Sequence, residues 1–452
     1  MTLSIYHSLT FHTLHLSLLH LIVDGICACG LMLMSRYIIS DFEANAMIVL
    51  YNILAFGTQP LTGKWVDGSG SASEKLKMAV VLLACGASVS LLSAYFTVLS
   101  AVVGTIMLGM GNSLFHVYGG KCVAVVSRYD IRAMGVFVST GAVGLAIGLG
   151  FSSPMLMVYF LLALLALSFL HLYIVNKQNI TIQAQRYTGN STNAEQSSAH
   201  GSVPFLYLAC LMLVVAGRAC IGEAVPSLRT SLQSMSAPMM MVVVSLVVMV
   251  GKAGGGFLSK RWGVRRVFTF SMLLSATFFL MCPWHDGLVL ATLILINLSM
   301  PCTLYLATKA VPGREGWAFG LLAMAILPGF LIGFLSKDNV TCQSLLMPLV
   351  ATVLLESFLL LYMRERRWQV LAASVVINIF TNVPLNAFIM SYSITSPFYI
   401  IGLECVVVAV EFVGYWLVLH DRHRAFKYSV LCNAFSAVVG FLCQLFTGSL
   451  YC

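Results

Sequence analysis

The first long apolar stretch of the sequence, residues 12–34, reads HTLHLSLLHLIVDGICACGLMLM. A bilayer core is about 30 Å thick, and an α-helix needs roughly 20 apolar residues to cross it. The stretch is long enough, and its single acidic residue, Asp24, stands near its centre. We therefore expect a membrane-spanning helix that carries one carboxyl group deep in the bilayer.

The composition extends this expectation to the whole chain. Of 452 residues, 59% are hydrophobic and 9% are charged, whereas about 25% of the residues of an ordinary soluble domain are charged. These values exclude an intrinsically disordered chain, a nucleic-acid-binding domain and a small secreted module held by disulfides. The class that remains is an all-α polytopic membrane protein.

Apolar stretches of similar length follow along the chain, twelve in a first series and three after it. The predicted parts are an N-terminal six-helix bundle (1–175), a polar cytoplasmic linker (176–203), a C-terminal six-helix bundle (204–363) and an extra three-helix segment (364–452). The predicted spans are 12–34, 44–66, 76–97, 99–126, 133–152, 154–175, 204–226, 236–259, 265–284, 287–307, 316–336, 344–363, 369–389, 396–419 and 427–449.

The basic residues predict the orientation, because Lys and Arg are enriched in cytoplasmic loops. With a cytoplasmic N-terminus, most of the 25 basic residues fall in or beside cytoplasmic loops, and only three fall on the extracellular side, namely Arg36, Arg229 and Lys337. The net charge of +9 is thus an orientation signal. We expect a multi-pass protein of the cytoplasmic (inner) membrane, with an extracellular C-terminus if all fifteen spans form.

Two loops share a pattern at equivalent places in the predicted halves. Residues 63–68 read GKWVDG and residues 256–266 read GFLSKRWGVRR, each between the second and third helix of its half. The pattern resembles the loop signature of the major facilitator superfamily, which implies two six-helix bundles that open alternately to the two sides. These residues then form cytoplasmic gate loops, unless their basic residues only set the orientation. The predicted gate residues are Gly63, Asp67, Gly256, Arg261, Gly263, Arg265 and Arg266.

Three further motifs resemble the fosmidomycin-resistance-like branch of that superfamily. They are HLIVD at 20–24, GMGNSLFH at 109–116 and VPGREGWAFG at 311–320. This resemblance implies export of a drug or metabolite driven by the proton gradient. Val117 and Leu149 stand where members of this branch and superfamily often have Pro. Uptake therefore stays open as the alternative direction.

Ionisable side chains inside a span are costly to insert, so each is a candidate for function. His20 and Asp24 are four residues apart and share one face of their helix, so the pair is a candidate proton-coupling site. A structural carboxylate, hydrogen-bonded to a neighbouring helix, is the alternative. Asn112 and His116 also share a face, and we expect them to point into a cavity. Lys121 either contacts the substrate or extends its ammonium to the cytoplasmic surface.

Arg218 and Glu223 are further candidates, on the seventh span. Five residues apart, they are poorly placed to pair with each other, so we expect their partners on other helices. Arg218 is predicted either to neutralise Asp24 in one conformation or to bind an anionic group of the substrate. The spacing of Gly141, Gly144 and Gly148 in the fifth span predicts close helix packing.

The sequence predicts no metal site, no catalytic nucleophile and no cofactor, with the proton gradient as the energy source. Most of the 13 cysteines lie within spans, and no spacing of Cys or His matches a common ligand pattern. In the last three spans, amide and carboxyl side chains are expected to form a polar seam between helices. This segment resembles a three-helix unit of bacterial membrane proteins and could bind a protein partner. The seam residues are Asn378, Asn382, Asn386, Glu404, Glu411, Asn433 and Ser436.

Together these observations predict a secondary active transporter and not an enzyme. Its partners are a small-molecule substrate, protons and the lipid bilayer, and nucleic acid is excluded. The leading function is proton-coupled efflux of a small organic molecule or drug. One alternative is proton-coupled uptake of a small anionic solute, with Arg218 and Lys121 as the anion site. The other is a membrane sensor or scaffold derived from a transporter.

Overall fold

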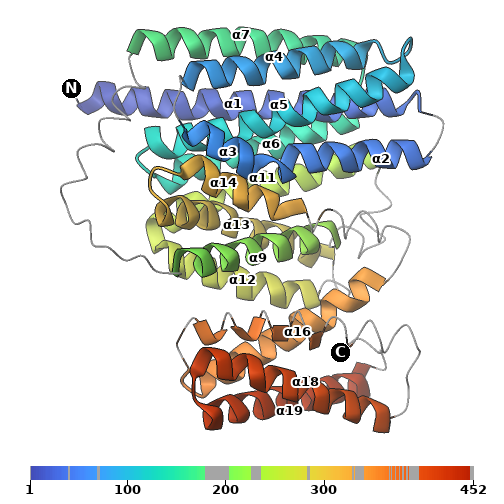
Figure 1. Ribbon diagram of the computed structural model, residues 1–452, viewed down its shortest axis with the longest axis vertical. Coiled ribbons are helices and arrows are strands. Elements are labelled where there is room, and N and C mark those ends of the chain that lie inside the picture. The colour runs from blue at the N-terminus through green and yellow to red at the C-terminus, as the bar shows by residue number, and fades with distance from the viewer. Residues whose placement is uncertain are drawn as a thin grey trace. The chain divides into compact units, whose positions relative to one another are not determined.

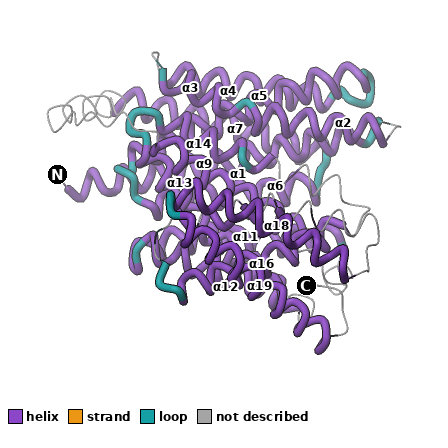
Figure 2. The backbone as a smooth tube through the Cα atoms, turned by 60° about the horizontal axis from the view of Figure 1, so that its bottom comes forward, coloured by secondary structure: helices purple, strands orange, loops and turns teal. Residues whose placement is uncertain are grey.

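The computed structural model is helical throughout the residues that it describes, without a β-strand among them (Figure 2). It describes residues 2–38, 41–68, 72–178, 203–224, 236–281, 286–327, 330, 341–365, 367, 369–371, 373–375, 377–378, 381–382, 385 and 397–447. The helices form because long apolar runs leave every backbone polar group to be satisfied within its own segment, as lipid requires. This architecture confirms the all-α polytopic fold class.

The helices coincide with the predicted spans along nearly the whole chain (Figure 1). The exceptions are 316–336, of which α14 covers only the first part, and 369–389; most of the second half of the former and most of the latter lie outside the described residues. The helices are α1 (Thr2–Ser35), α2 (Asp41–Asn52), η1 (Ile53–Gly57), α3 (Gln59–Asp67), α4 (Ala72–Leu91), α5 (Thr97–Val126), α6 (Ile131–Gly150), α7 (Pro154–Gln178), α9 (Val203–Ala224), α11 (Ala237–Trp262), α12 (Val264–Met281), α13 (Asp286–Ala310), α14 (Glu315–Met324), α16 (Thr341–Tyr362), α18 (Pro397–Leu419) and α19 (Arg422–Thr447).

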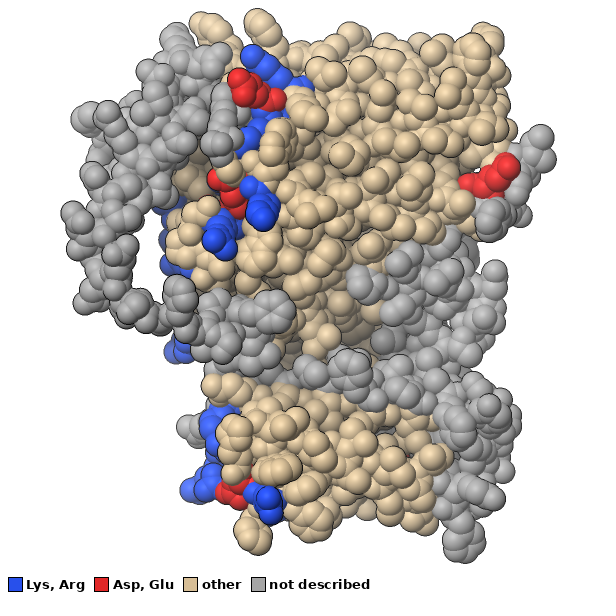
Figure 3. All heavy atoms as spheres, viewed as in Figure 1, with Lys and Arg blue, Asp and Glu red and all other residues tan. Residues whose placement is uncertain are grey.

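Eight helices in the described part of the chain are long and apolar enough to cross a membrane. They lie within α1, α5, α6, α7, α11, α12, α13 and α18. Figure 3 shows that the charged side chains of the visible face gather mostly at one end of the helices, while the flanks are almost free of charge. An apolar flank is what a helix bundle presents to lipid.

The chain divides into two compact units. The first comprises residues 1–272 and 290–331, and the second comprises 273–289 and 332–452. In this division α16 groups with the C-terminal helices, although the sequence predicts a boundary after residue 363. The predicted linker, 176–203, lies almost wholly outside the described residues, so the four-part organisation stays a prediction.

Glycines allow close packing of α1 against α6 in the first unit. A Cβ atom on Gly144 would collide with the backbone carbonyl of Leu21, and one on Gly148 would collide with that of Gly25. Only glycine lets the two backbones approach this closely. The predicted role of the fifth-span glycines is confirmed, and the close approach brings α6 against the helix that carries Asp24.

The second predicted span is broken by one turn of π-helix. Residues Ile53–Gly57 form this turn between α2 and α3, and Pro60 stands in the first turn of α3. Such π-turns widen a helix locally and are common at functional sites. The side-chain amide of Gln59, which follows the turn, donates to the Ala55 carbonyl within it at 2.8 Å.

The second unit contains the predicted polar seam. Glu356 accepts hydrogen bonds from Ser374 (3.1 Å) and Asn378 (2.6 Å), and Glu411 accepts from Thr381 (3.3 Å) and from Asn433. Glu356, on α16, was not expected in the seam. Asn386 lies outside the described residues. The seam joins α16, the following segment, α18 and α19 through amides and carboxyls.

A loop carboxylate joins the segment after α16 to α19 in the second unit. Glu365 accepts from the guanidinium of Arg367 at 2.6 Å and from the hydroxyl of Tyr428 at 3.0 Å. The hydrogen bonds with Arg367 lower the pKa of Glu365 from 4.5 to about 2. A carboxyl with a lowered pKa stabilises the fold above its unfolded pKa, and this stabilisation is lost as the pH falls toward the folded value.

We therefore predict a pH-dependent effect of Glu365→Gln. At neutral pH the variant should unfold more easily by about 1 kcal/mol, a modest value because Arg367 is 47% exposed and solvent screens the pair. The deficit should shrink as the pH falls from about 4.5 toward about 2, as read from the melting temperature of the purified protein. Arg424→Gln, in a more exposed pair, should have a smaller effect. A deficit that is the same at every pH would contradict the assignment.

Candidate functional site

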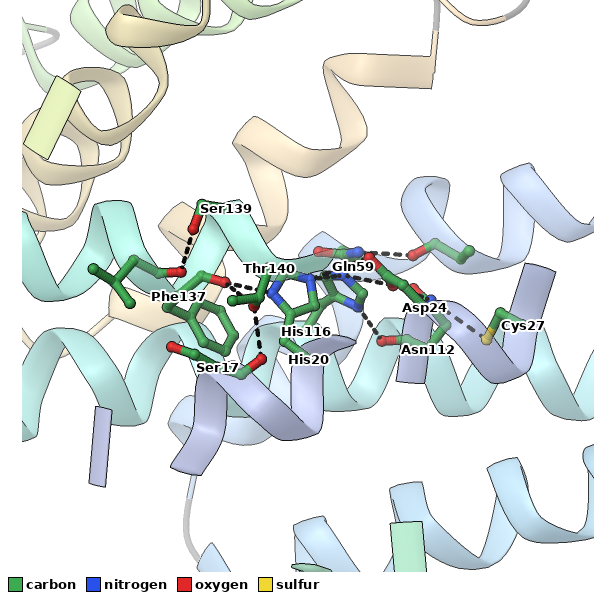
Figure 4. Close-up of polar contacts among 12 residues, drawn as sticks. Ser17, His20, Asp24, Cys27, Gln59, Asn112, His116, Phe137, Ser139 and Thr140 are labelled. Atoms are coloured by element: carbon green, nitrogen blue, oxygen red, sulfur yellow. Dashed lines mark hydrogen bonds and ion pairs between the residues drawn. The ribbon is translucent and has the colours of Figure 1, made fainter. Parts of the chain in front are cut away.

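The candidate site is built around Asp24 on α1. Its carboxylate lies 3.3 Å from Nε2 of His20, one turn earlier on the same helix, and 3.4 Å from Nε2 of His116 on α5. The two imidazoles are also in direct contact, with 2.8 Å between their Nε2 atoms (Figure 4). All three side chains are largely buried. The structure therefore brings together the predicted pair His20–Asp24 and the predicted cavity residue His116.

Backbone carbonyls determine the tautomer of each imidazole. Nδ1 of His20 lies 2.7 Å from the carbonyl oxygen of Phe137, and Nδ1 of His116 lies 3.0 Å from that of Asn112. A carbonyl oxygen only accepts, so each Nδ1 must carry a hydrogen and donate it. In a neutral imidazole the other nitrogen, Nε2, then has a lone pair and no hydrogen.

The contact between the two histidines consequently requires one additional proton. Two lone pairs at 2.8 Å repel each other, whereas a proton placed between them makes an N–H···N hydrogen bond of ordinary length. With that proton the imidazole pair of His20 and His116 carries one positive charge, which the carboxylate of Asp24 balances. Without it the cluster carries the negative charge of Asp24 alone. We call His20, Asp24 and His116 the proton cluster.

Neighbouring residues hold the proton cluster in place. The amide of Asn112 donates to Asp24 at 3.3 Å and contacts the Cys27 sulfur at 3.5 Å. On α6, a Cβ atom at Gly141 would collide with the Asp24 carboxylate and the His20 ring, so a glycine is required there. The close packing of α1 against α6 is therefore also a condition for the cluster.

The donor set of the proton cluster could also hold a metal ion. Two imidazole nitrogens and a carboxylate oxygen lie within 4.8 Å of one another, and zinc accepts such ligands. Nitrogens bound tetrahedrally about 2.0–2.1 Å from zinc stand roughly 3.3 Å apart. The Nε2 atoms are 2.8 Å apart, which matches a shared proton better.

The proton cluster forms part of the wall of a cavity of about 700 Å³ in the first unit. Arg218 on α9 and Lys252 on α11 also line this cavity. No ion pair joins either cation to a carboxylate among the side chains that the structure describes, and Asp24 pairs with the histidines instead. The cavity is therefore lined by the contacting side chains of His20, Asp24 and His116 on α1 and α5, and by two cations on α9 and α11 that have no ion pair among the described residues.

Three buried polar atoms of the lining residues have no partner. They are Oε1 of Gln59, Oδ1 of Asn112 and Nη1 of Arg218. The amide nitrogens of Gln59 and Asn112 are already engaged, which turns their oxygens into free acceptors. Buried polar groups are nearly always satisfied, so a ligand or water is expected to meet these atoms.

The end of the first unit that was predicted to be cytoplasmic is closed by contacts between the predicted halves. The carboxylate of Asp67 accepts the backbone N–H groups of Gly316 (2.9 Å) and Trp317 (2.7 Å) at the start of α14. A negative charge at a helix N-terminus is favourable because it meets free N–H groups and the positive end of the dipole. A Cβ atom on Gly63 would collide with the Gly316 carbonyl. Gly63 and Asp67 thus form a close seam between α3 and α14.

Lys121 belongs to this closed end and does not line the cavity. Its ammonium lies 3.0 Å from the Asp67 carboxylate and donates to the Val66 carbonyl at 3.3 Å. Of the two alternatives for Lys121, this placement favours the second, in which its ammonium extends to the end of the helices that was predicted to be cytoplasmic. A second link nearby is the hydroxyl of Tyr129, which donates to Glu315 at 2.6 Å.

The second gate loop contributes differently from the first. Gly256 packs against the backbone of Ile131 at the start of α6, and Gly263 ends α11 with a φ of +90° that favours glycine. Arg261, Arg265 and Arg266 are exposed, without an ion pair in the described part of the chain. The predicted clasp of charges is therefore made by Asp67 and Lys121 in this conformation, and the Arg side chains of the second loop take no part.

Sequence reasoning missed two lining residues and named one whose side chain is not described. Neither Lys252 nor Gln59 is among the candidate residues named from the sequence. Both are polar side chains inside predicted spans, and that signal could have identified them. The side chain of Glu223 lies outside the described residues, so its predicted role stays a prediction.

No family model and no curated protein matches the sequence, but solved structures do. A variant of the E. coli fucose:proton symporter FucP is similar over 72% of this chain and 92% of that chain, with 16% identity and a TM-score of 0.50. FucP in the outward conformation, a Major Facilitator Superfamily transporter, is similar over 73% of this chain and 92% of that chain, with 14% identity and a TM-score of 0.50. A bacterial homologue of the iron transporter ferroportin in an outward-facing state is similar over 84% of this chain and 99% of that chain, with 14% identity and a TM-score of 0.53.

The closed end gives a testable expectation for Asp67→Asn. Removing the charge weakens the bonds to α14 and abolishes the ion pair with Lys121, and bonds to a charged group are worth about 1.5–3 kcal/mol. The cytoplasmic end should open roughly tenfold more often. An impermeant maleimide added on the cytoplasmic side should then label a cysteine introduced at Leu322, a cavity-lining residue of α14, about tenfold faster.

The matched control for this prediction is Glu74→Gln, which removes an exposed carboxylate in the first turn of α4. Labelling at residue 322 should not change in that variant. Unchanged labelling in Asp67→Asn would show that the cap on α14 does not hold the end closed.

Proposed function

Because the chain has the major facilitator fold, we propose that it is a secondary transporter driven by protons. The observation that carries the proposal is the contact between the Nε2 atoms of His20 and His116, which requires one additional proton. This proton is the coupling ion, and Asp24 balances its charge. Proton coupling needs a site that binds one proton and that lies beside a cavity large enough for the substrate.

Alternating access supplies the second half of the mechanism. Asp67 on α3 accepts hydrogen bonds from the start of α14, and in the proposed mechanism these contacts close the cytoplasmic end of the transporter. Major facilitator proteins expose such a central site to one side at a time as their two halves rock. Loss of the proton leaves two lone pairs facing each other across 2.8 Å. The histidines must then separate, which links the proton to a movement of α1 against α5.

The cargo is a small organic molecule, because the cavity of about 700 Å³ is lined mostly by apolar side chains with a few polar groups. Export against the proton gradient is the direction that the sequence motifs imply. Uptake together with a proton is the second candidate. It is favoured by the placement of the unpaired cations, Arg218 and Lys252, on helices other than those of the proton cluster, so that substrate and proton need not compete for one site.

We predict that Asp24→Asn and His20→Gln separate substrate exchange from proton coupling. Each variant should lose most of the pH-gradient-driven accumulation in proteoliposomes. In neither variant can the proton cluster bind a proton whose charge is balanced by a carboxylate. Exchange of substrate across vesicles without a gradient should persist. The substrate for the assay is identified first by a thermal-shift screen of the purified protein against metabolites and antibiotics.

His171→Gln is the matched control, since His171 is a buried histidine of the same unit that contacts Tyr118 and stands outside the cavity. It should keep both exchange and accumulation. Wild-type accumulation by both cluster variants would rule out the proposed coupling site. Accumulation with an acidic exterior indicates uptake, and accumulation with an acidic interior indicates export. Binding without any flux would indicate the sensor or scaffold.

A further inference from the structure

Arg218 is a buried cation whose guanidinium has an unsatisfied hydrogen-bond donor. Its residue is 7% exposed, its Nη1 has no hydrogen-bond partner, and it lines the cavity. A guanidinium withdrawn from water is stable when an anion that accepts two hydrogen bonds, such as a carboxylate or a phosphonate, satisfies it. Lys252 on α11 lines the same cavity and is close enough to Arg218 to feel its charge. Two cations beside one another repel, and an anion between them removes the repulsion.

The unpartnered acceptors of the cavity describe a second requirement of the ligand. Oε1 of Gln59 and Oδ1 of Asn112 have no donors, and both side chains are fixed through their amide nitrogens. A ligand with hydroxyl or amino groups would satisfy these oxygens. A purely apolar ligand would leave them buried without partners, and each would then cost about 1–3 kcal/mol.

The charge of the lining depends on the proton. Among the residues that the structure describes, the charged ones of the lining are Arg218, Lys252 and Asp24. When the proton is present, His20 and His116 together balance Asp24, and the two other cations leave the cavity with two positive charges. When the proton has left, Asp24 is unbalanced and one net positive charge remains. Protonation therefore raises the attraction of the cavity for an anion.

We infer that the substrate is a small organic anion with hydroxyl or amino groups, that its anionic group binds to Arg218 and Lys252, and that it is carried together with the proton. This inference rests on the proposed proton coupling, adds the class of substrate, and selects the second candidate direction, uptake together with a proton. Binding free energies are reciprocal, so the anion also strengthens binding of the proton. Mutual strengthening is the thermodynamic condition for moving both in one direction.

Other groups around the proton cluster do not reverse this sign. On α1 and α2 the titratable neighbours are Cys27 and Tyr51, which are buried, and thiols and phenols are ordinarily uncharged at neutral pH. On α6 the facing residues are Gly141 and Phe137, which carry no charge. Lys252 is the charged group of α11 that acts on Asp24. The proton shared by the histidines is therefore the charge that changes.

The test measures binding to the purified full-length chain by thermal shift and calorimetry, with acetate, methylphosphonate and D-gluconate as anionic probes. D-Glucose serves as the neutral match of gluconate. Gluconate should stabilise the protein and glucose should not, and the affinity for gluconate should fall as the pH rises. Arg218→Gln should weaken binding of the anions by roughly tenfold or more, and Lys252→Gln by less. Arg36→Gln, at a site outside the cavity, should bind as the wild type does.

Equal responses to gluconate and glucose in the wild-type protein would overturn the inference, as would no response to any of the three anions. Both outcomes can be read without a variant, so poor folding of Arg218→Gln leaves the test intact. Arg218→Lys, which keeps the charge, should retain the preference for gluconate.

The Asp24→Asn variant keeps this failure distinct from failure of the proposed function. It should bind anions without the pH dependence and lose gradient-driven transport. Anion binding together with wild-type transport by Asp24→Asn would overturn the coupling site and leave the anion site standing. Loss of transport by Asp24→Asn, together with unchanged anion binding by Arg218→Gln, would support the coupling site and overturn the anion site.

Discussion

The contact between the Nε2 atoms of two imidazoles whose Nδ1 atoms are both bonded to backbone carbonyls is the constraint on which the rest of the site depends. His20 and His116 each donate their Nδ1 hydrogen to a backbone carbonyl, which leaves two Nε2 lone pairs facing each other. Helix backbones supply both carbonyls, so the rings cannot turn without leaving the bonds. A single proton resolves the conflict, and Asp24 is placed where its charge balances that proton.

The helix packing serves this arrangement. Gly144 and Gly148 let α6 approach α1, and Gly141 leaves room for the Asp24 carboxylate and the His20 ring. The same packing places Phe137 of α6 where its carbonyl accepts from His20. Substituting these glycines would push α6 away and remove one of the bonds that determine the tautomer, so close packing and proton binding are one requirement.

Much of the fold and part of the site could be predicted. Apolar length located the helices, because the thickness of a bilayer sets the length of a span. Helical spacing also paired His20 with Asp24, and Asn112 with His116, because residues four apart share a face. The sequence left two alternatives open for Lys121 and did not single out Lys252, since it does not show where each side chain lies relative to the cavity. The π-turn at Ile53–Gly57, which positions Gln59, also has no simple sequence signal.

The sequence by itself determined an all-α membrane protein with few charges, and it identified Asp24, His20, His116 and Arg218 as the ionisable groups to examine. These conclusions follow from local properties, namely apolar length and the spacing of residues on one helix. Only the tertiary structure decided that the two histidines meet across α1 and α5, and that Arg218 and Lys252 share the cavity without pairing to Asp24. Such contacts depend on the approach and rotation of neighbouring helices, which are set by packing between residues far apart in the chain.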